Sequence, residues 1–196
     1  RVLQVPLFPL STVLFPGGPL PLRIFEPRYV SMVRDCVRDD APFGVLLIRQ
    51  GRETGPASTH DIGTLARITD WYQGSDGLLG VTAIGEQRFR VLSRERRADG
   101  LNVGTVELLP DEAAVPLPPE YQEMTHILGD VLDDLGRLYE SLDRRMDDAG
   151  WVTSRFVEIL PIELEQKQRC LENSDPLERL ELVRKLLDAA RMAPRG

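Results

Sequence analysis

The chain has 196 residues, of which 42% are hydrophobic and 28% charged, and its formal net charge is −7. This length suits one large domain or two small ones, and the hydrophobic share is sufficient for a sizeable core. The net negative charge disfavours a general nucleic-acid binder, which needs a basic surface. No run of 18 apolar residues and no basic-then-apolar leader occurs, so we expect no transmembrane helix. The chain begins at Arg1 rather than at a methionine, which leaves open whether a leader was removed.

The first informative segment is proline-rich and apolar. Residues 6–29 contain six prolines, at positions 6, 9, 16, 19, 21 and 27. Proline breaks helices and cannot donate to central sheet pairing, so we expect short extended pieces joined by turns. Glu26-Pro27 is typical of a helix start, with proline at the first helical position. Apolar residues at helical spacing after it predict a helix over residues 27–38.

Residues 43–108 have the pattern of β-structure. Residues 43–48 form an apolar run of strand length. Runs 64–71 and 78–84 flank an Asp-Gly turn, and runs 87–93 and 103–108 flank a second one. Asp-Gly between β-prone runs is a strong hairpin signal. We therefore expect two hairpins which, with the N-terminal extended pieces, form a small closed antiparallel barrel.

The remainder of the chain has a helical pattern. Prolines at 116, 118 and 119 indicate a stiff connector, so we predict domains over residues 1–115 and 116–196. Apolar residues recur every three or four positions from Tyr121 to Leu142, which predicts one long helix ending near Gly150. Its wide apolar stripe packs on a domain or, alternatively, forms a dimer face. A shorter helix precedes Pro161, and we expect a new helix to begin there.

The last helix has a clear start signal. Asp175 can cap it, Pro176 fits its first position, and Glu178 completes a capping box. The two cysteines, Cys36 and Cys170, lie in apolar helical patterns and are expected to be buried free thiols in a reducing compartment; a long-range disulfide is the alternative.

Residues 6–29 closely resemble the opening of the Lon substrate-binding domain family, and residues 160–180 resemble its helical tail. The family includes the N-terminal domain of the ATP-dependent protease Lon and free-standing relatives. The resemblance implies an α+β fold, in which a PUA-like small antiparallel β-barrel with one interrupting helix is followed by a C-terminal helical bundle. It also implies a recognition domain that lacks the ATPase and protease modules, and so not an enzyme.

Signals for catalysis and cofactors are weak. The only lysines, Lys167 and Lys185, lie in predicted amphipathic helices, and no glycine-rich serine motif accompanies them. The glycines at 80 and 85 have the spacing of a phosphate loop, but Glu86-Gln87 follows where Lys-Ser/Thr is needed. His60 and His126 match no metal-binding spacing. We therefore expect no catalytic residue, cofactor or metal.

The candidate binding residues are Trp71, Tyr72, Arg23, Glu26 and Arg28. The two aromatics end a predicted strand beside a Gly-Ser-Asp-Gly turn, where exposed aromatics anchor partners; a core pair that caps the barrel is the alternative. The three charged residues either line a groove beside the first helix or form an ion-paired helix start.

The favoured function is recognition of unfolded or extended polypeptide, or of a protein partner such as a protease or chaperone, in the cytoplasm. The alternatives are an RNA-binding PUA-like domain, for which a small basic patch at Arg94, Arg96 and Arg97 is the candidate, and a small-ligand-binding protein. Nucleic acid is the less expected partner because the chain is acidic, and no membrane partner is expected.

Overall fold

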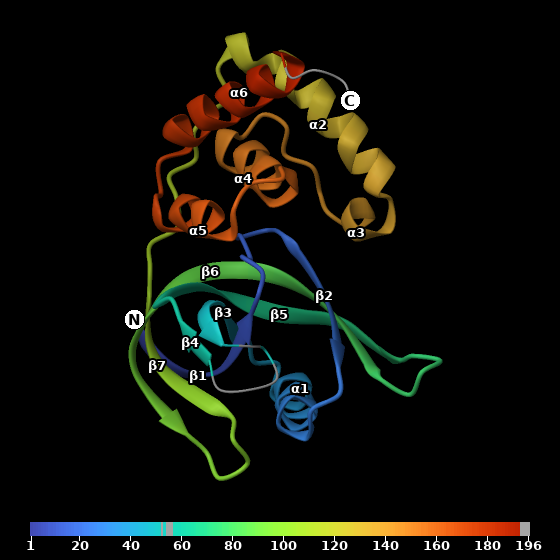
Figure 1. Cartoon of the computed structure of the whole chain (residues 1–196), viewed down its shortest axis with the longest axis vertical. Helices are drawn as coiled ribbons and strands as arrows, with labels where there is room; N and C mark the ends of the chain where they lie inside the picture. Colours follow the sequence, from blue (N-terminus) through green and yellow to red (C-terminus); the bar gives the residue numbers. More distant parts are fainter. Residues whose placement is uncertain (52, 54–56, 193–196) are drawn as a thin grey trace. The chain divides into compact units, whose positions relative to one another are not determined.

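The computed structural model describes residues 1–51, 53 and 57–192. The chain divides into two compact units, Arg1–Asp111 and Glu112–Gly196. The first unit contains the strands and one helix, and the second contains the other helices (Figure 1). A mixed α and β composition is therefore confirmed. The predicted domains 1–115 and 116–196 stay a prediction, since they concern independent folding.

The strands of the first unit are β1 (Val2–Leu10), β2 (Pro19–Ile24), β3 (Phe43–Gly51), β4 (Ala57–Thr59), β5 (Ile62–Gln73), β6 (Leu79–Arg96) and β7 (Asn102–Leu108). Antiparallel pairs join β1 to β7, β7 to β6, β6 to β5 and β5 to β3. A parallel pair then joins β3 back to β1, so the path of pairings returns to its first strand. β2 pairs with β6, and β4 pairs with β3.

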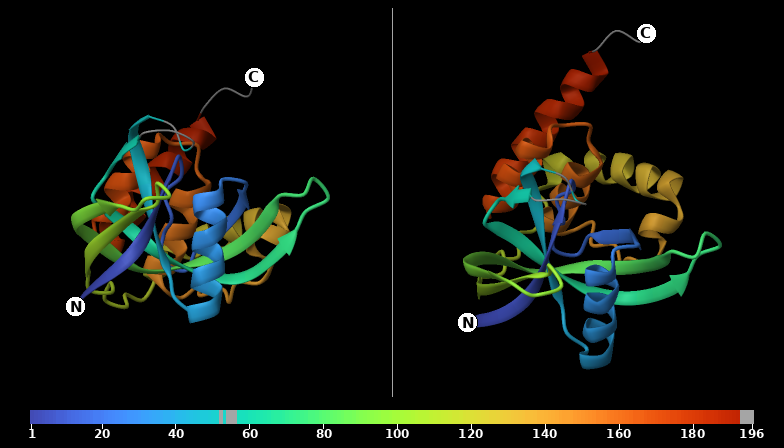
Figure 2. Two further views of the ribbon diagram at one scale, coloured as in Figure 1. Left: turned by 90° about the horizontal axis from the view of Figure 1, so that it is seen from below. Right: turned by 60° about the horizontal axis from the view of Figure 1, so that its bottom comes forward.

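The expectation of a wholly antiparallel sheet is wrong at one pair, because β1 and β3 run parallel from Leu7↔Gly44 to Leu10↔Leu47. Parallel neighbours need a long crossover connection, and here the chain between them passes through β2 and helix α1 (Pro27–Asp39). Figure 2 shows this helix in two further views. The crossover is a non-local feature that no turn motif indicates.

Both predicted hairpins are present, as β5–β6 and β6–β7. The two runs predicted on either side of residue 85 instead form one strand, β6, of 18 residues. The chain around Phe15 crosses β6 closely at Gly85, where an added Cβ would lie 2.2 Å from the Phe15 carbonyl oxygen. The strand can continue past this point because glycine has no side chain. The Gly85 N–H donates to the Gly18 carbonyl at 2.9 Å, so this glycine serves strand packing.

Helix α1 begins and ends within one residue of the prediction. It buries Tyr29, Met32, Val33 and Cys36 against the sheet. The ring of Tyr29 stacks on that of Phe8 with centroids 4.0 Å apart. A second cluster, formed by Val5, Leu7, Leu46, Leu65, Phe89 and Val106, fills the space between β1, β3, β5, β6 and β7. Together these clusters hold the strands that present the site described below.

The second unit consists of the 3-10 turn η1 (Pro119–Tyr121) and the helices α2 (Gln122–Leu135), α3 (Arg137–Glu140), α4 (Ala149–Ile159), α5 (Leu164–Glu172) and α6 (Pro176–Met192). The prediction of one long helix from residue 121 to about residue 150 is wrong. Gly136 ends α2 with φ 56° and ψ −117°, a conformation that glycine adopts readily. α4 begins after Asp148, whose carboxylate accepts the Gly150 N–H at 3.0 Å.

The later helices follow the sequence signals with two differences. α4 ends before Pro161 as expected, but α5 begins only at Leu164. Asp175 caps α6 by accepting the Leu177 N–H at 3.0 Å. The Asp175 N–H bonds to the Asn173 side chain, and Glu178 accepts from the amide of the same asparagine. In the expected capping box Glu178 would accept directly from the Asp175 N–H. Here the Asn173 side chain lies between them, because its amide carries both a donor and an acceptor.

Both cysteines are free and buried, as predicted. Burial raises the pKa of Cys36 to about 11, and the nearby Asp35 and Asp39 act in the same direction. Burial also raises the pKa of Cys170, against smaller opposing effects of Arg179 and Arg169.

Candidate functional site

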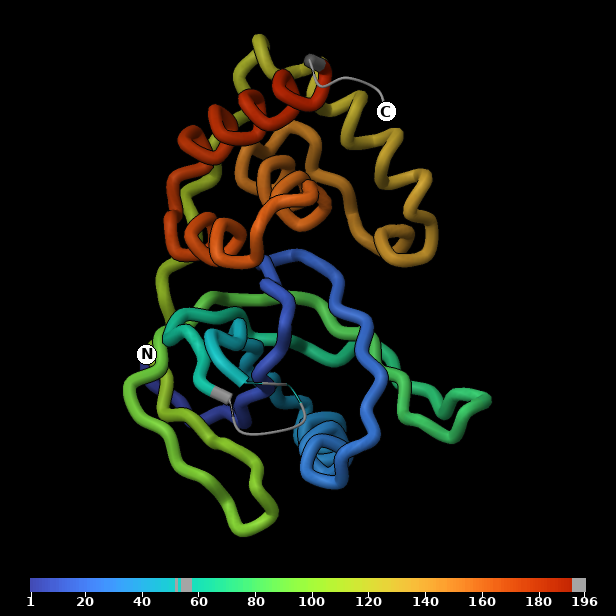
Figure 3. Tube along the Cα trace, in the orientation of Figure 1, coloured from blue at the N-terminus to red at the C-terminus, as the bar shows by residue number. Residues whose placement is uncertain are grey.

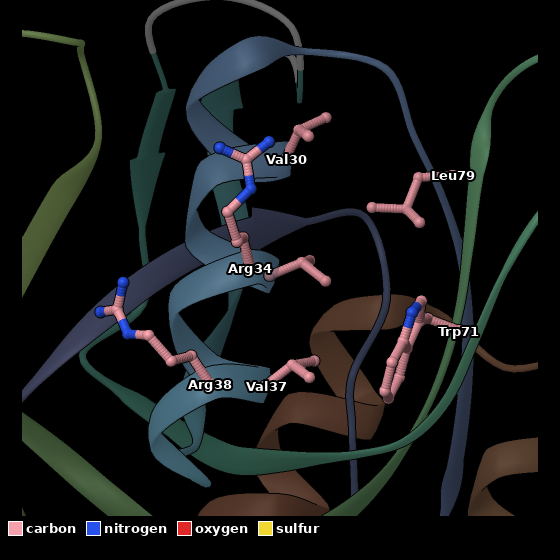
Figure 4. A pocket seen from close by; sticks show the side chains of 7 residues that line it. Val30, Arg34, Val37, Arg38, Trp71 and Leu79 are labelled. Carbon is pink, nitrogen blue, oxygen red and sulfur yellow. The ribbon is translucent and has the colours of Figure 1, made fainter.

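An open, mostly apolar pocket lies between α1 and the far part of the β5–β6 hairpin (Figure 4). Its volume is about 440 Å³, within the range of small-ligand and side-chain pockets. We call it the α1–β5 pocket. Its lining consists of Val30, Val33, Arg34, Val37, Arg38, Trp71 and Leu79.

The helical wall of the pocket is a row of valines. Val30, Val33 and Val37 are three and four positions apart, which places them on one side of α1. Val33 is buried in the core, whereas Val30 and Val37 are half-buried at its edge. The pocket is thus an open continuation of the packing between helix and sheet.

The strand wall exists because the β5–β6 hairpin extends beyond the body of the first unit (Figure 3). Trp71 lies opposite Val81 on β6. Opposite residues of an antiparallel pair point to the same face, and Val81 is a core residue with 1% exposure. Trp71 therefore belongs to the core face of the hairpin, yet it is 54% exposed because α1 does not cover it. Figure 4 shows its ring and Leu79 across the gap from Val30 and Val37.

The structure separates the two aromatics predicted as a pair. Adjacent residues of a strand point to opposite faces, so Tyr72 lies on the face away from the pocket. Its ring lies over Gly80, where an added Cβ would come within 2.3 Å of it. Arg23 on β2 pairs with Gly80 from the other edge of β6, so it lies on the same face of the sheet as Tyr72. It forms an ion pair with Asp76. Tyr72 is 57% exposed, so neither aromatic is a core residue.

Glu26 and Arg28 are placed at the start of α1 and contact each other. The Arg28 Nε donates to the Glu26 carboxylate at 2.7 Å, and Nη1 donates to the Gly100 carbonyl at 3.0 Å. The guanidinium also lies 4.7 Å from the centroid of the Tyr29 ring. These contacts attach the helix start to the β6–β7 turn, which is the ion-paired arrangement considered as the alternative. A role of either residue in binding stays a prediction.

Two arginines border the pocket, and they differ in their partners. Arg38 contacts Asp39 at 2.9 Å and Asp35 at 3.2 Å; the hydrogen bond to Asp39 and the two nearby carboxylates raise its pKa, and these carboxylates compete with a ligand for its guanidinium. Arg34 is exposed, and within the described residues no ion pair is assigned to it. Figure 4 shows the Arg34 guanidinium rising beside Val30, whereas Arg38 extends to the side of α1 away from Trp71. Arg34 is thus the cation available to a ligand.

The lining defines the chemistry that this pocket can perform. Valine, leucine and tryptophan provide apolar contact, and arginine provides positive charge and hydrogen-bond donors. None of these side chains is a metal ligand of the usual kind or an activated nucleophile. Across the described residues, no three or more His, Cys, Asp or Glu side chains gather as a metal site would require. The arrangement therefore suits binding.

Of the pocket residues, the sequence prediction included only Trp71. It missed Arg34 and Leu79, and it assigned Val33 and Val37 to the core face of the helix without recognising an open edge. The available signal was Val30, which widens the apolar stripe of α1 beyond what one buried face needs.

A second group of polar side chains lies in the helical unit, where Arg155 and Tyr139 are buried and Glu158 and Lys167 are half-buried. The Glu158 carboxylate accepts from Arg155 at 2.6 Å and from the Tyr139 hydroxyl at 2.9 Å, while Lys167 donates to the Glu158 carbonyl at 2.7 Å. Burial raises the pKa of Glu158 and of Tyr139 and lowers that of Lys167. Lys167 is thus bonded to a carbonyl oxygen of the α4–α5 region, and this group is a helix-packing network.

Comparison with known proteins identifies the family to which the chain belongs. Residues 4–189 match the family described as the ATP-dependent protease La (LON) substrate-binding domain, and the chain belongs to this family. A Lon N-terminal domain protein from Xanthomonas campestris, known from a crystal structure, is 35% identical with a TM-score of 0.74, over 98% of this chain and 99% of that one. The N-terminal domain of the Mycobacterium avium complex Lon protease, 17% identical with a TM-score of 0.64, shares the fold.

Two longer proteins are also similar to this chain. Lon protease 2 of Myxococcus xanthus is 26% identical over 95% of this chain but only 24% of its own length. Protein cereblon of Xenopus tropicalis is 38% identical over 59% of this chain and 26% of its own length. The chain spans about a quarter of each of these relatives. No helix in the described part of the chain has the length and apolar character to cross a bilayer.

Proposed function

We propose that the chain is a non-catalytic recognition module that binds apolar segments of unfolded or extended polypeptide in the α1–β5 pocket. The observation that carries the proposal is the exposed Trp71, which the β5–β6 hairpin holds facing a row of valines. Large aromatic side chains beside an open apolar surface are frequent energetic centres of protein recognition. The family to which the chain belongs is named for substrate binding, which supports the same conclusion.

The free edge of β5 supports an extended ligand. β3 pairs with β5 only as far as Ala66, and beyond it, within the described residues, the strand pairs only with β6. A peptide can add its backbone to such an edge while alternate side chains enter a neighbouring pocket. The Trp71 N–H bonds to the Asp70 carboxylate at 2.8 Å, a contact that protects this edge until a ligand replaces it.

The proposal also includes the barrel and bundle architecture of the two units, and the cellular location and partner of the chain. The ring of strand pairings supports a small PUA-like barrel, and contact between α4 and α6 supports a C-terminal helical bundle. We place the chain in cytoplasmic protein quality control, acting with a protease or chaperone partner. Binding by Tyr72, Arg23, Glu26 and Arg28 would require a ligand that extends beyond the pocket.

The contacts of the described residues weaken the RNA-binding alternative. Among the arginines considered for RNA binding, Arg94 donates to Asp61 at 2.9 Å and to the His60 carbonyl at 3.3 Å. This pairing lowers the positive charge available for phosphate. A small-ligand function would use the same pocket and is separated from peptide binding by the experiment below.

The test is a fluorescence-anisotropy titration of the whole chain into a labelled, permanently unfolded polypeptide, with the folded parent protein as control. We expect saturable binding to the unfolded form alone. Trp71→Ala should weaken it by about tenfold or more, because removing a central aromatic typically costs about 2 kcal/mol.

Two control variants make the test specific to the pocket. Tyr72→Ala removes an equally exposed aromatic from the opposite face, and Leu92→Ala removes another exposed apolar side chain, with 53% exposure, from β6. Leu92→Ala should bind within about twofold of the unchanged chain, and Tyr72→Ala should lose clearly less binding than Trp71→Ala. Equal loss in Trp71→Ala and Tyr72→Ala would contradict the assignment of this pocket, and no binding by the unchanged chain would contradict the function.

A further inference from the structure

The α1–β5 pocket combines an apolar interior with an exposed, positively charged rim. Its interior is formed by Val30, Val33, Val37, Leu79 and Trp71. Arg38 is engaged by two carboxylates, whereas Arg34 is exposed beside Val30 and carries its charge at the rim.

We propose that the pocket selects polypeptide segments in which apolar residues are flanked by a carboxylate, with Arg34 as the residue that recognises the acidic group. This inference rests on the proposed function and specifies its substrate class. An apolar side chain would enter between Trp71 and the valines. A flanking Asp or Glu side chain would then reach the guanidinium, whose planar donors match a carboxylate.

The charge of the whole chain makes this selectivity unusual. The formal net charge is −7, so long-range electrostatics would favour basic ligands over acidic ones. A preference for acidic segments must therefore come from the local surface, where Arg34 is the available cation. Such a contact at an exposed rim contributes mainly to specificity and to the association rate.

The experiment uses three labelled peptides with one apolar core, Val-Leu-Phe-Val, flanked by two aspartates, two glutamines or two lysines. Each is titrated against the whole chain and against Arg34→Glu, Arg34→Lys, Arg97→Glu and Trp71→Ala. Arg97 is an exposed arginine at the β6–β7 turn and serves as the matched charge control.

The unchanged chain should bind the aspartate peptide about fivefold more tightly than the glutamine peptide, and the lysine peptide most weakly. Arg34→Glu should invert this order, Arg34→Lys should retain it, and Arg97→Glu should leave it unchanged. The preference should shrink as salt is raised from about 0.05 M to about 0.5 M, because the contact is exposed. Inversion of the order is a gain of binding that misfolding cannot produce.

Other outcomes overturn the inference in distinguishable ways. If all three peptides bind equally and Trp71→Ala abolishes binding, the proposed function stands and the acidic selectivity fails. A preference for the lysine peptide, or inversion by Arg97→Glu, also refutes the role of Arg34. If no peptide binds the unchanged chain, the proposed function fails and this inference fails with it.

Discussion

Arg179 is expected to be a principal stabilising residue of the helical unit. Its side chain is 3% exposed and pairs with both carboxylate oxygens of Glu112, at 2.5 and 2.7 Å. It also donates to the Thr153 hydroxyl at 3.1 Å and to the Asn173 carbonyl at 3.1 Å. The guanidinium therefore joins the segment before η1, helix α4 and the α5–α6 connection at one point.

Replacement by leucine removes these four hydrogen bonds and leaves the Glu112 carboxylate without its partner. Breaking a buried pair by removing one charge costs about 3–5 kcal/mol. Glu112 is 23% exposed and can recover part of its hydration, so we expect the lower part of this range, about 3 kcal/mol. Arg179→Leu combined with Glu112→Leu should be less destabilised than Arg179→Leu alone, since no unpaired charge remains.

The assay is urea unfolding followed by tryptophan fluorescence. The chain contains two tryptophans, Trp71 in the first unit and Trp151 in α4. In a Trp71→Phe background, Trp151 reports on the helical unit alone. A loss below about 1 kcal/mol for Arg179→Leu, or a double variant no more stable than that single variant, would refute this account of the pair.

Two further predictions concern the backbone and a thiol. Gly136→Ala should destabilise the helical unit by about 1–2 kcal/mol in the same assay: an added Cβ meets nothing within 4 Å, so only the backbone strain at φ 56° acts. Gly129→Ala, inside α2, is the matched control and should stabilise by about 0.5–1 kcal/mol; equal effects would contradict the assignment of strain. Cys36, with its pKa raised to about 11, should be alkylated at pH 8 about 100-fold more slowly in the folded chain than in urea, as measured by peptide mapping, and equal rates would contradict its burial. The same thiol contributes stability below pH 9 that is lost as pH rises from 9 towards 11, because the unfolded chain ionises first.

Local signals predicted the elements that depend on local chemistry. The two Asp-Gly turns, the proline at the start of α1 and the cap at Asp175 all act through neighbouring residues, and each predicted element is present. The errors arise from contacts between distant residues or from backbone conformation. Periodicity continues through Gly136 and so cannot indicate that this glycine adopts a positive φ. The parallel pairing of β1 with β3 and the continuity of β6 at Gly85 both depend on distant segments.

The candidate site was predictable in part. Trp71 was identified because it ends a strand beside a turn, and the structure places it in the α1–β5 pocket. The alternation of strand side chains already implied that Tyr72 points to the other face, but only the β5–β6 register shows which face is the core. Val30 widens the apolar stripe of α1 and so was a signal for the helical wall, but whether that wall stays open depends on how far α1 reaches along the hairpin.

The central claim is that apolar polypeptide occupies the pocket beside Trp71. The most direct measurement is the emission of Trp71 in a Trp151→Phe background, titrated with an unfolded polypeptide that lacks tryptophan. The account predicts a saturable blue shift with the same dissociation constant as the anisotropy titration, because the ligand excludes water from the indole. Saturable anisotropy without any change in Trp71 emission would contradict the claim, since the polypeptide would then bind elsewhere on the chain.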